Sequence, residues 1–277
     1  MEEKMELSAY ERVRIARDNN RPRIGDYIDA LFEDFIELKG DRLGKEDKAI
    51  LGGIALFHGC PVTIIGHRKG KNIEENLACN FGMPEPEGYR KALRLMQQAE
   101  KFKRPVITFI DTPGAYPGIM AEENGQSIAI AQSIAGMSAL KIPIISVITG
   151  EGNSGGALAI AVANSILMFE NSVYSILSPE GFASILWKDS SKSSKACELM
   201  KMTAEDLKKF KLVDEIIPEP EGGIQANPAK AYDILDKMLM TELKKYAKVS
   251  GDSIAKMRYQ KFRKIDSACG MIRKETR

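Results

Sequence analysis

The chain has 277 residues, of which 44% are hydrophobic and 28% charged, and it carries a formal net charge of +2. This composition is typical of a globular protein with a packed apolar core and excludes a largely disordered chain. Because the charges nearly balance, the sequence gives no general attraction to polyanions, and we predict no specific nucleic-acid binding.

The cysteines and the apolar runs exclude two further classes of protein. Cys60, Cys79, Cys197 and Cys269 form no C-x-x-C pair of the kind that structural zinc sites use, so we expect free thiols in a reducing cytosol. The first eleven residues are polar and charged, unlike a signal peptide. No apolar run reaches the roughly 20 residues that span a bilayer. The sequence therefore predicts a cytoplasmic protein with no membrane-embedded segment.

The first third of the chain predicts two helices and a hairpin. Apolar residues at helical spacing indicate an amphipathic helix over residues 24–38 and another over 87–103. Two runs of β type, residues 49–57 and 61–67, are separated by His58-Gly59-Cys60, which is typical of a hairpin turn.

The middle of the chain repeats one pattern of a short apolar strand, a glycine-rich turn and a helix. The first unit has its strand at residues 106–110 and its helix at 121–140; the second has a strand at 143–148 and a helix of small residues at 157–163. Consecutive units of this kind are the sequence form of βαβ crossovers, which require parallel strands with helices on the faces. We therefore predict an α/β core.

The last third of the chain is mainly helical. Ser178-Pro179-Glu180 has the residues preferred where a helix starts, and helical segments follow to about Phe210. At this position we expect Glu180 to be a cap rather than a catalytic acid. A last strand is predicted at residues 212–217, and helix from Asn227 onward. Residues 241–277 carry eleven Lys or Arg against four acidic residues. Two interpretations of this basic end stay open: a solvated helical face, or a docking surface for phosphates or an acidic partner.

The two glycine-rich turns, residues 111–118 and 150–156, are the candidate site. At such turns unpaired backbone N–H groups converge at the start of a helix, and glycine lets a ligand oxygen approach closely. Adjacent amides placed in this way stabilise an oxyanion. The alternative is that the glycines only permit tight turns and close helix packing.

Three sharper motifs can be compared with the second turn. Gly150 and Gly155 have P-loop spacing, but Gly156 stands where the phosphate-binding Lys is required. Binding of a nucleoside triphosphate is therefore not supported. The segment GNSGG matches the G-x-S-x-G nucleophile elbow of hydrolases, with Ser154 as the nucleophile. Against this, both histidines, His58 and His67, lie upstream of the serine, so only a Ser-Lys arrangement remains open.

A dinucleotide fingerprint is the third alternative. Gly150, Gly152 and Gly155 fit the G-x-G-x-x-G spacing after a strand, and Glu170 lies about 20 positions further on. An NAD-dependent enzyme therefore stays open as a weaker interpretation of the same residues.

Several longer motifs in a fixed order resemble the carboxyltransferase alpha subunits of bacterial acetyl-CoA carboxylases. They are YERV at 10–13, GDR at 40–42, IGH at 65–67, NFGMP at 80–84, GYRKALR at 88–94, FIDTPGAYPG at 109–118, SGGALA at 154–159, and SPEG at 178–181 continuing to SILWK at 184–188. The resemblance covers nearly the whole chain. Asn153, where the family usually has Gly, and Phe182, where Cys is usual, are small departures that leave the glycine pair intact.

The resemblance implies a fold and a division of the chain. The implied fold is an α/β fold of the crotonase type (ClpP/crotonase superfamily), a spiral core of ββα units with helical extensions at both ends. We expect an N-terminal helical extension at 1–40, a carboxyltransferase core at 41–220 and a basic helical region at 221–277.

The resemblance also implies an activity and its partners. The activity is transfer of a carboxyl group from carboxybiotin, presented by a biotin carboxyl carrier protein, to acetyl-CoA, giving malonyl-CoA in the first committed step of fatty acid biosynthesis. The implied partners are a zinc-ribbon beta subunit in an α2β2 assembly, the carrier protein and biotin carboxylase. No metal is expected in this chain, and another crotonase-type CoA enzyme is the nearest alternative.

The resemblance places roles on the two turns. It implies that the backbone amides of Gly155 and Gly156 form an oxyanion hole. The residues implied to line the carboxybiotin pocket are Gly114, Ala115, Tyr116, Pro117, Gly118 and Ser154. Two roles stay open for Tyr116: it either orients a ligand or packs against its neighbours. Two roles also stay open for His67 and Arg68: they either reach an anion or have their hydrogen bonds satisfied at the end of a strand.

Overall fold

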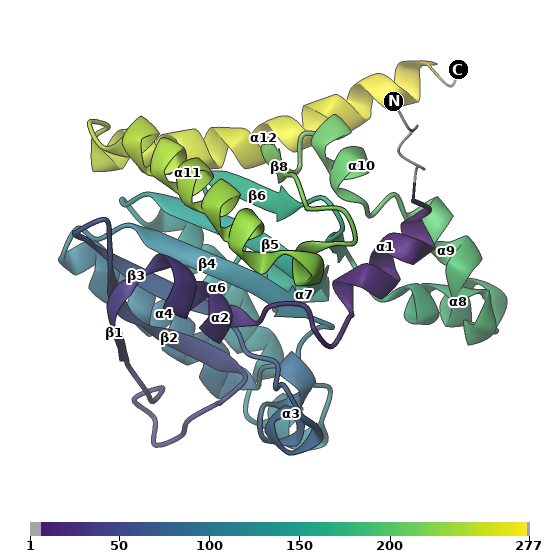
Figure 1. The fold of residues 1–277 in the computed structure, drawn as a ribbon, viewed down its shortest axis with the longest axis horizontal. Coiled ribbons are helices and arrows are strands. Elements are labelled where there is room, and N and C mark those ends of the chain that lie inside the picture. Colours follow the sequence, from purple (N-terminus) through teal and green to yellow (C-terminus); the bar gives the residue numbers. More distant parts are fainter. Residues whose placement is uncertain (1–6, 276–277) are drawn as a thin grey trace.

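One mixed sheet forms the middle layer of the computed structural model, which describes residues 7–275, with side chains as far as residue 265 (Figure 1). Within that range the sheet has eight strands in the order β1-β2-β3-β4-β5-β6-β8, with β7 paired to β5. The strands are β1 (Glu33–Glu37), β2 (Ile50–Phe57), β3 (Cys60–His67), β4 (Val106–Thr112), β5 (Ile144–Asn153), β6 (Ser165–Phe169), β7 (Val173–Ser175) and β8 (Glu215–Ile217).

The pairing of the strands confirms the predicted hairpin and the predicted parallel core. β2 and β3 are antiparallel and are joined by a two-residue turn in which His58 and Gly59 both have positive φ, 48° and 74°. β3, β4, β5 and β6 run parallel to one another. Every residue of β4 and β5 is buried, as expected for parallel strands covered on both faces.

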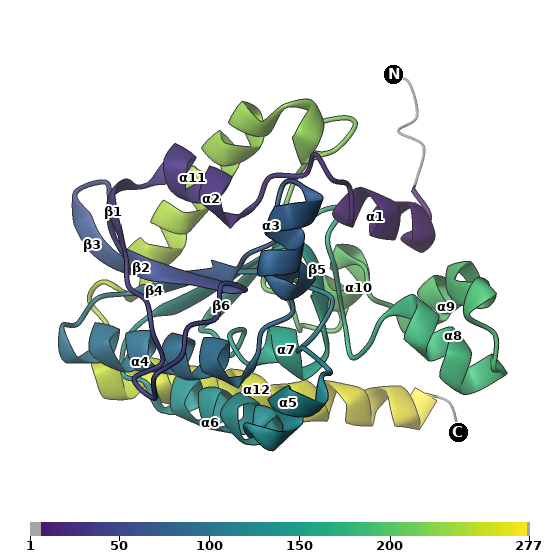
Figure 2. The same cartoon turned by 90° about the horizontal axis from the view of Figure 1, so that it is seen from below.

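Helices cover both faces of the sheet. They are α1 (Ala9–Ala16), α2 (Ile24–Leu31), α3 (Ile73–Ala78), α4 (Pro86–Lys101), α5 (Ile119–Glu123), α6 (Gln126–Ala139), α7 (Ser154–Leu158), α8 (Pro179–Trp187), α9 (Ser193–Met200), α10 (Ala204–Lys209), α11 (Pro228–Tyr246) and α12 (Gly251–Glu275), with 3₁₀ turns at Asn80–Gly82, Ser190–Lys192 and Ile224–Ala226. Figure 2 shows α4, α6 and α12 on one face and α2 and α11 on the other, while α8 and α9 project beyond the end of the sheet.

The two faces are packed separately. Leu95 and Met96 of α4 pack into one buried cluster with Ile148 of β5, and Tyr27 of α2 packs into a second cluster with Leu235 of α11. Among the described residues, no helix combines the length and the apolar character needed to cross a bilayer.

The prediction of a helix over residues 24–38 was wrong beyond Leu31. The chain extends at Phe32, with φ −129° and ψ 151°, and then forms strand β1, in which Ile36 pairs with Ile54 of β2. Helical periodicity in a short run cannot show whether the segment will instead pair with the free edge of a sheet. Here the hydrogen bonds to the edge of β2 favour a strand over a helix.

Glycines explain the other departures from prediction. The helix predicted at 121–140 is divided into α5 and α6 at Gly125, whose φ is 85°. The second glycine turn is shorter than predicted, because Gly150 and Gly152 still belong to strand β5. The helix predicted at 157–163 is the single turn α7, which begins three residues earlier.

The basic C-terminal region is partly used for packing. Arg258 of α12 is buried and donates to the carbonyl oxygens of Met137 (3.0 Å), Leu140 (2.7 Å) and Ile142 (2.8 Å), near the end of α6. Carbonyl groups at a helix C-terminus have no partner within the helix, so this side chain supplies one. The carbonyls also offset the cost of burying the guanidinium.

A buried ion pair attaches the segment between α1 and α2 to the sheet. Arg21 Nη2 lies 2.7 Å from Glu219 Oε1, and both side chains are 1% exposed. The guanidinium also donates to the carbonyl of Thr149 (2.6 Å) and to the hydroxyl of Ser172 (3.1 Å). Burial alone would raise the pKa of the Glu219 carboxyl, but Arg21 outweighs burial and holds that pKa below its usual range.

Replacing Arg21 tests this attachment. Arg21→Met leaves Glu219 charged and unpaired in the interior, which typically costs about 3–5 kcal/mol. We expect the free energy of unfolding, measured by urea denaturation, to fall by that amount. Arg14 of α1 is exposed, and Arg14→Met should change the same quantity by less than about 0.5 kcal/mol. Equal effects of the two substitutions would contradict the assignment.

Candidate functional site

The two predicted turns meet at the carboxyl ends of β4 and β5. These strands are parallel neighbours, and Thr112 of β4 pairs with Gly152 of β5. A Cβ atom placed on Gly156 would lie 2.4 Å from the backbone nitrogen of Ala115 and 2.6 Å from the carbonyl carbon of Gly114. The two turns are therefore in direct backbone contact, and only glycine fits at position 156.

The first turn is closed by its own hydrogen bonds. The hydroxyl of Thr112 accepts from the N–H of Gly114 (3.0 Å) and donates to the carbonyl of the same residue (2.8 Å). Gly114 has φ 144°, in the region that favours glycine. The Tyr116 ring lies against Gly118, where an added Cβ would be 2.3 Å from Cε1. Of the two roles left open for Tyr116, the structure shows packing on its own turn.

The second turn changes the chain from strand to helix within one residue. Asn153 is extended, Ser154 has φ 61°, and Gly155 and Gly156 follow in the first turn of α7. A positive φ at a residue with a side chain costs on the order of 1 kcal/mol or more. The N–H groups of Gly155 and Gly156 are too early in the helix to have partners within it. Ser154 is exposed and Gly156 is buried.

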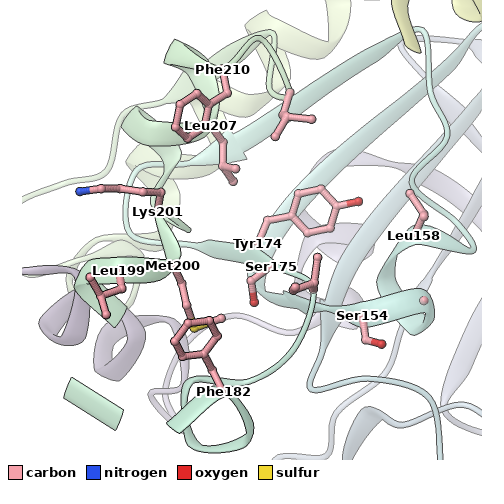
Figure 3. A pocket seen from close by; sticks show the side chains of 13 residues that line it. Ser154, Leu158, Tyr174, Ser175, Phe182, Leu199, Met200, Lys201, Leu207 and Phe210 are labelled. Atoms are coloured by element: carbon pink, nitrogen blue, oxygen red, sulfur yellow. The ribbon is translucent and has the colours of Figure 1, made fainter. Parts of the chain in front are cut away.

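A cavity of about 580 Å³ opens beside the second turn (Figure 3). Its wall consists of Ser154, Gly155, Leu158, Tyr174, Ser175, Ile176, Phe182, Leu199, Met200, Lys201, Leu207, Phe210 and Leu212. Figure 3 shows the Tyr174 ring directed toward the α7 side, while Lys201 extends outward. The cavity is mainly apolar, with a backbone amide at one side.

The predicted site residues therefore fall into two groups. Ser154 and Gly155 lie on the wall of this cavity, whereas Gly156 and residues 114–118 do not line it, and Gly156 contacts the backbone of the first turn. The sequence predicted that the two turns meet, but it missed the other walls, which come from β7 and the helices α8 to α10. Those side chains are ordinary apolar residues in sequence, so no motif marks them.

The geometry at Ser154 resembles a nucleophile elbow but provides no base. The His67 ring is buried against the carbonyl oxygens of Gly156 and Phe109. His58 is exposed and bonds to Asp236 (2.7 Å). Among the described residues, no hydrogen bond joins the Ser154 hydroxyl to a histidine or lysine. The serine therefore lacks the activation that nucleophilic catalysis requires.

The dinucleotide fingerprint does not form. Gly150 and Gly152 lie in β5 rather than in a turn, and a Cβ on Gly150 would be 2.3 Å from Asp111 Oδ1. The glycine at position 150 thus makes room for a carboxylate of the neighbouring strand. The carboxylate of Glu170 accepts the backbone N–H of Glu219 (3.2 Å).

Buried charges beneath the turns were missed by the sequence argument. Asp111 and Glu151 precede the two turns, and both contact Lys69. Burial would raise the pKa of the Asp111 carboxyl, but Lys69 and Arg23 together hold it below its usual range. A carboxylate a few residues before each glycine turn was the signal that could have found this group.

His67 and Arg68 do not act together on an anion. Burial lowers the pKa of His67 from 6.5 to about 4, although Asp111 and the nearby carbonyl oxygens act in the opposite direction. Arg68 is half-buried and pairs with Glu37 at 3.2 Å. Within the described part of the chain, no group of three or more His, Cys, Asp or Glu side chains is arranged to hold a metal ion.

Comparisons with known proteins agree on one family. The family model described as acetyl co-enzyme A carboxylase carboxyltransferase-like matches residues 2–266. A protein of Shouchella clausii (strain KSM-K16), the acetyl-coenzyme A carboxylase carboxyl transferase subunit alpha, is 57% identical over 94% of this chain and 80% of its own length. The protein of the same name from Clostridium perfringens (strain SM101 / Type A) is 54% identical over 94% of this chain and 96% of its own.

Solved structures share the fold at low sequence identity. The transcarboxylase 12S structure has a TM-score of 0.68 and 17% identity over 89% of this chain and 46% of that chain. A Pseudomonas malonate decarboxylase hetero-tetramer in complex with coenzyme A has a TM-score of 0.66 and 14% identity over 83% of this chain and 92% of that one. The α/β fold of the crotonase type is thereby confirmed.

The adjacent glycines should respond differently to an added methyl group. Gly156→Ala forces a Cβ into the backbone of the first turn, and overpacking of this kind costs about 1–3 kcal/mol. A Cβ on Gly155 would meet only the Ile130 side chain, at ordinary distances of 3.5 Å to Cγ2 and 3.9 Å to Cδ1, so Gly155→Ala should leave stability unchanged or raise it by up to about 1 kcal/mol. Thermal unfolding of both variants checks this. A Gly156→Ala protein more stable than the parent would contradict the close contact between Gly156 and the first turn.

The contribution of His67 to stability should fall as the pH is lowered. In the unfolded chain His67 binds a proton near pH 6.5, whereas in the folded chain burial delays protonation until about pH 4. This residue therefore lowers the free energy of unfolding as the pH is lowered through that range. The expected slope is on the order of 1 kcal/mol per pH unit. Asp47, whose pKa burial raises to about 6, acts in the opposite direction.

The contribution of His67 can be separated by substitution. His67→Gln keeps Asp47 and the other carboxyl groups, so subtracting its urea-denaturation curves from those of the parent protein isolates the histidine. We expect the difference in unfolding free energy to change steadily between pH 6.5 and 4.5. A difference independent of pH would mean that His67 is not held neutral by burial.

Proposed function

Because the chain belongs to the acetyl-CoA carboxylase carboxyltransferase family, we propose that it works as the alpha subunit that helps to move a carboxyl group from carboxybiotin to acetyl-CoA. The product is malonyl-CoA, the first committed intermediate of fatty acid biosynthesis. The family is one of transferases, and a serine hydrolase is set aside because Ser154 has no activating base. A dinucleotide enzyme is set aside because two of its three fingerprint glycines, Gly150 and Gly152, lie in a strand.

The observation that carries the proposal is the backbone amide of Gly155 at the wall of a mainly apolar cavity. A cavity of about 580 Å³ is within the usual range for small-molecule sites, which is about 300–1,000 Å³. Its apolar wall suits the hydrocarbon part of biotin, and an amide at its side suits the ureido oxygen. The residues present therefore fit the group.

When bound, carboxybiotin supplies the carboxyl carbon, whose bond to a ring nitrogen is exchanged for a bond to the methyl carbon of acetyl-CoA while a methyl proton passes to that nitrogen. Negative charge develops on oxygen atoms during such an exchange. In our proposal the N–H groups of Gly155 and Gly156 donate to that charge, Ser154 lies on the pocket wall, and residues 114–118 support the site by contact with Gly156. Loss of one such donor typically costs about 10²–10³ in rate.

Two constraints in the structure support roles for both glycines. Gly155 lies on the wall of the cavity, and its N–H, in the first turn of α7, has no partner within the helix. Gly156 is fixed by contact with the first turn, which orients the peptide that joins it to Gly155. The site needs no protein base, since the proton acceptor is provided by the carboxyl donor after transfer.

Exposed apolar side chains on the cavity wall and on other helices support a partner subunit. Ile176 beside the cavity is 79% exposed and Ile119 of α5 is 78% exposed. Further exposed apolar side chains on the neighbouring helices are Met120, Ile128, Ile185, Leu186 and Leu199. Apolar patches of this kind mark protein–protein contacts. We assign this surface to a zinc-bearing beta subunit in an α2β2 assembly.

The remaining parts of the proposal concern the cellular setting. The carboxyl donor is delivered on the biotin carboxyl carrier protein after loading by biotin carboxylase, and acetyl-CoA is held mainly by the beta subunit. Residues 41–220 form the core that carries both turns, with 1–40 and 221–277 as extensions. Cys60, Cys79 and Cys197 are free, in keeping with a cytoplasmic protein; Cys269 lies outside the residues whose side chains are described.

A reconstitution assay tests the proposal. The chain is mixed with carboxylated biotin carrier protein and acetyl-CoA, with and without the beta subunit, and malonyl-CoA is measured by mass spectrometry. We expect product only when both subunits are present. Absence of malonyl-CoA in the complete mixture would reject the function.

Replacing the serine separates a transferase from a hydrolase. Ser154→Gly removes the hydroxyl and relieves the positive φ, while the backbone amides remain. We expect transfer to continue within about tenfold of the parent rate, because backbone donors carry the main effect. If Ser154 were a nucleophile, the substitution would instead lower kcat by a factor on the order of 10⁶.

A further inference from the structure

Two carboxylates end the strands that carry the glycine turns. Asp111 lies in β4 three residues before Gly114, and Glu151 lies in β5 four residues before Gly155. Their side chains are only 8% and 7% exposed. Charges buried at this depth are costly unless they are paired. Their partners therefore determine how the ends of the two strands lie against each other.

One cation bridges both carboxylates. Lys69, just after β3, places its Nζ 2.6 Å from Asp111 Oδ1 and 3.3 Å from Glu151 Oε1, and its side chain is 10% exposed. Glycines make room on both sides of the bridge. A Cβ on Gly82 would lie 2.7 Å from the Lys69 stem, and one on Gly150 would lie 2.3 Å from Asp111 Oδ1.

The bridge continues into the wall of the cavity. Asn153 Nδ2 donates to Glu151 Oε2 (3.3 Å), and Asn153 Oδ1 accepts from the hydroxyl of Ser175 (2.9 Å). Asn153 immediately precedes Ser154, and Ser175 lines the cavity. A shift of Glu151 is therefore transmitted through one side chain to the residue that begins the second turn.

Two arginines complete the group of charges. Arg23 pairs with Asp111 at 3.2 Å, and Arg17 pairs with Glu151 at 2.8 Å and with Glu180 of α8 at 2.8 Å. Three cations thus face three carboxylates. Buried ion pairs contribute little net stability compared with apolar replacements, whereas their geometry is specific. This balance favours a role in alignment over a role in stability.

We propose that Lys69 is a positioning residue for carboxyl transfer, which fixes the two glycine turns relative to each other by bridging Asp111 and Glu151. The inference rests on the proposed function, because it assigns the alignment of the turns to that reaction. Lys69 itself does not line the cavity. It acts through Glu151 and Asn153 on the backbone amides beside it.

The first variant removes the bridge. Lys69→Met keeps the length of the stem but leaves one carboxylate in excess in the interior. In the complete enzyme with the beta subunit, we expect kcat for malonyl-CoA formation to fall about 10–100-fold, because small displacements of reacting groups cost about this much. KM for acetyl-CoA should change by less than about twofold, since that substrate is not bound by these residues.

The second variant separates alignment from stability. Lys69→Met combined with Glu151→Gln removes one charge of each sign and restores the balance. We expect the thermal midpoint to return toward the parent value while kcat stays at least about tenfold low. Recovery of kcat together with the thermal midpoint would overturn the proposal, because it would show that Lys69 only maintains stability.

A matched control and the parent enzyme complete the experiment. Lys71 lies two residues later, pairs with Asp26 and has a side chain that is 65% exposed, so Lys71→Met should leave kcat unchanged. A parent enzyme that makes no malonyl-CoA would reject the proposed function itself. An active parent together with an equally active Lys69→Met enzyme would reject only the positioning role.

Discussion

The contact between the backbones of two turns is the constraint on which the site depends. Strands β4 and β5 run parallel and end side by side, so the turns that follow them are held within van der Waals distance at Gly156, Gly114 and Ala115. A side chain at position 156 would separate them. Gly155 lies on the cavity wall, next to the glycine that is held against the first turn. In the function proposed above, this arrangement places backbone hydrogen-bond donors where charge develops on a ligand oxygen.

Charge is used around the site for alignment. The cavity wall is mainly apolar, while the ion pairs of Lys69, Arg17 and Arg23 lie beneath it and hold the ends of the strands. Such a division allows the cavity to accept an apolar group while the donors remain fixed. Ile176 on the cavity wall and Ile119 of α5 are both strongly exposed apolar side chains, which suits the partner subunit proposed above.

Much of this arrangement could be predicted from the sequence, because the repeated strand, turn and helix pattern fixes parallel strands whose carboxyl ends share one edge. The glycines of both turns and the absence of a downstream histidine also limited the chemistry. What the sequence could not provide depends on distant contacts. The strand at Glu33–Glu37 forms because β2 offers a free edge, and the cavity walls from β7 and α8 to α10 come from residues with no motif. Lys69 was missed because its partners lie 42 and 82 positions further along the chain.

The pair of Arg21 and Glu219 has a consequence for the order in which the molecule is completed during synthesis. The two residues are 198 positions apart, so the ribosome must deliver most of the chain before the N-terminal segment can take its final place. Until then the Arg21 guanidinium is hydrated and has no desolvation penalty. When Glu219 is synthesised, its cationic partner is already present in the chain. The entropic cost of closing a loop grows only slowly with its length, but the closure of so long a loop is slow. The segment around Arg21 is therefore made well before Glu219 and is among the last to be fixed.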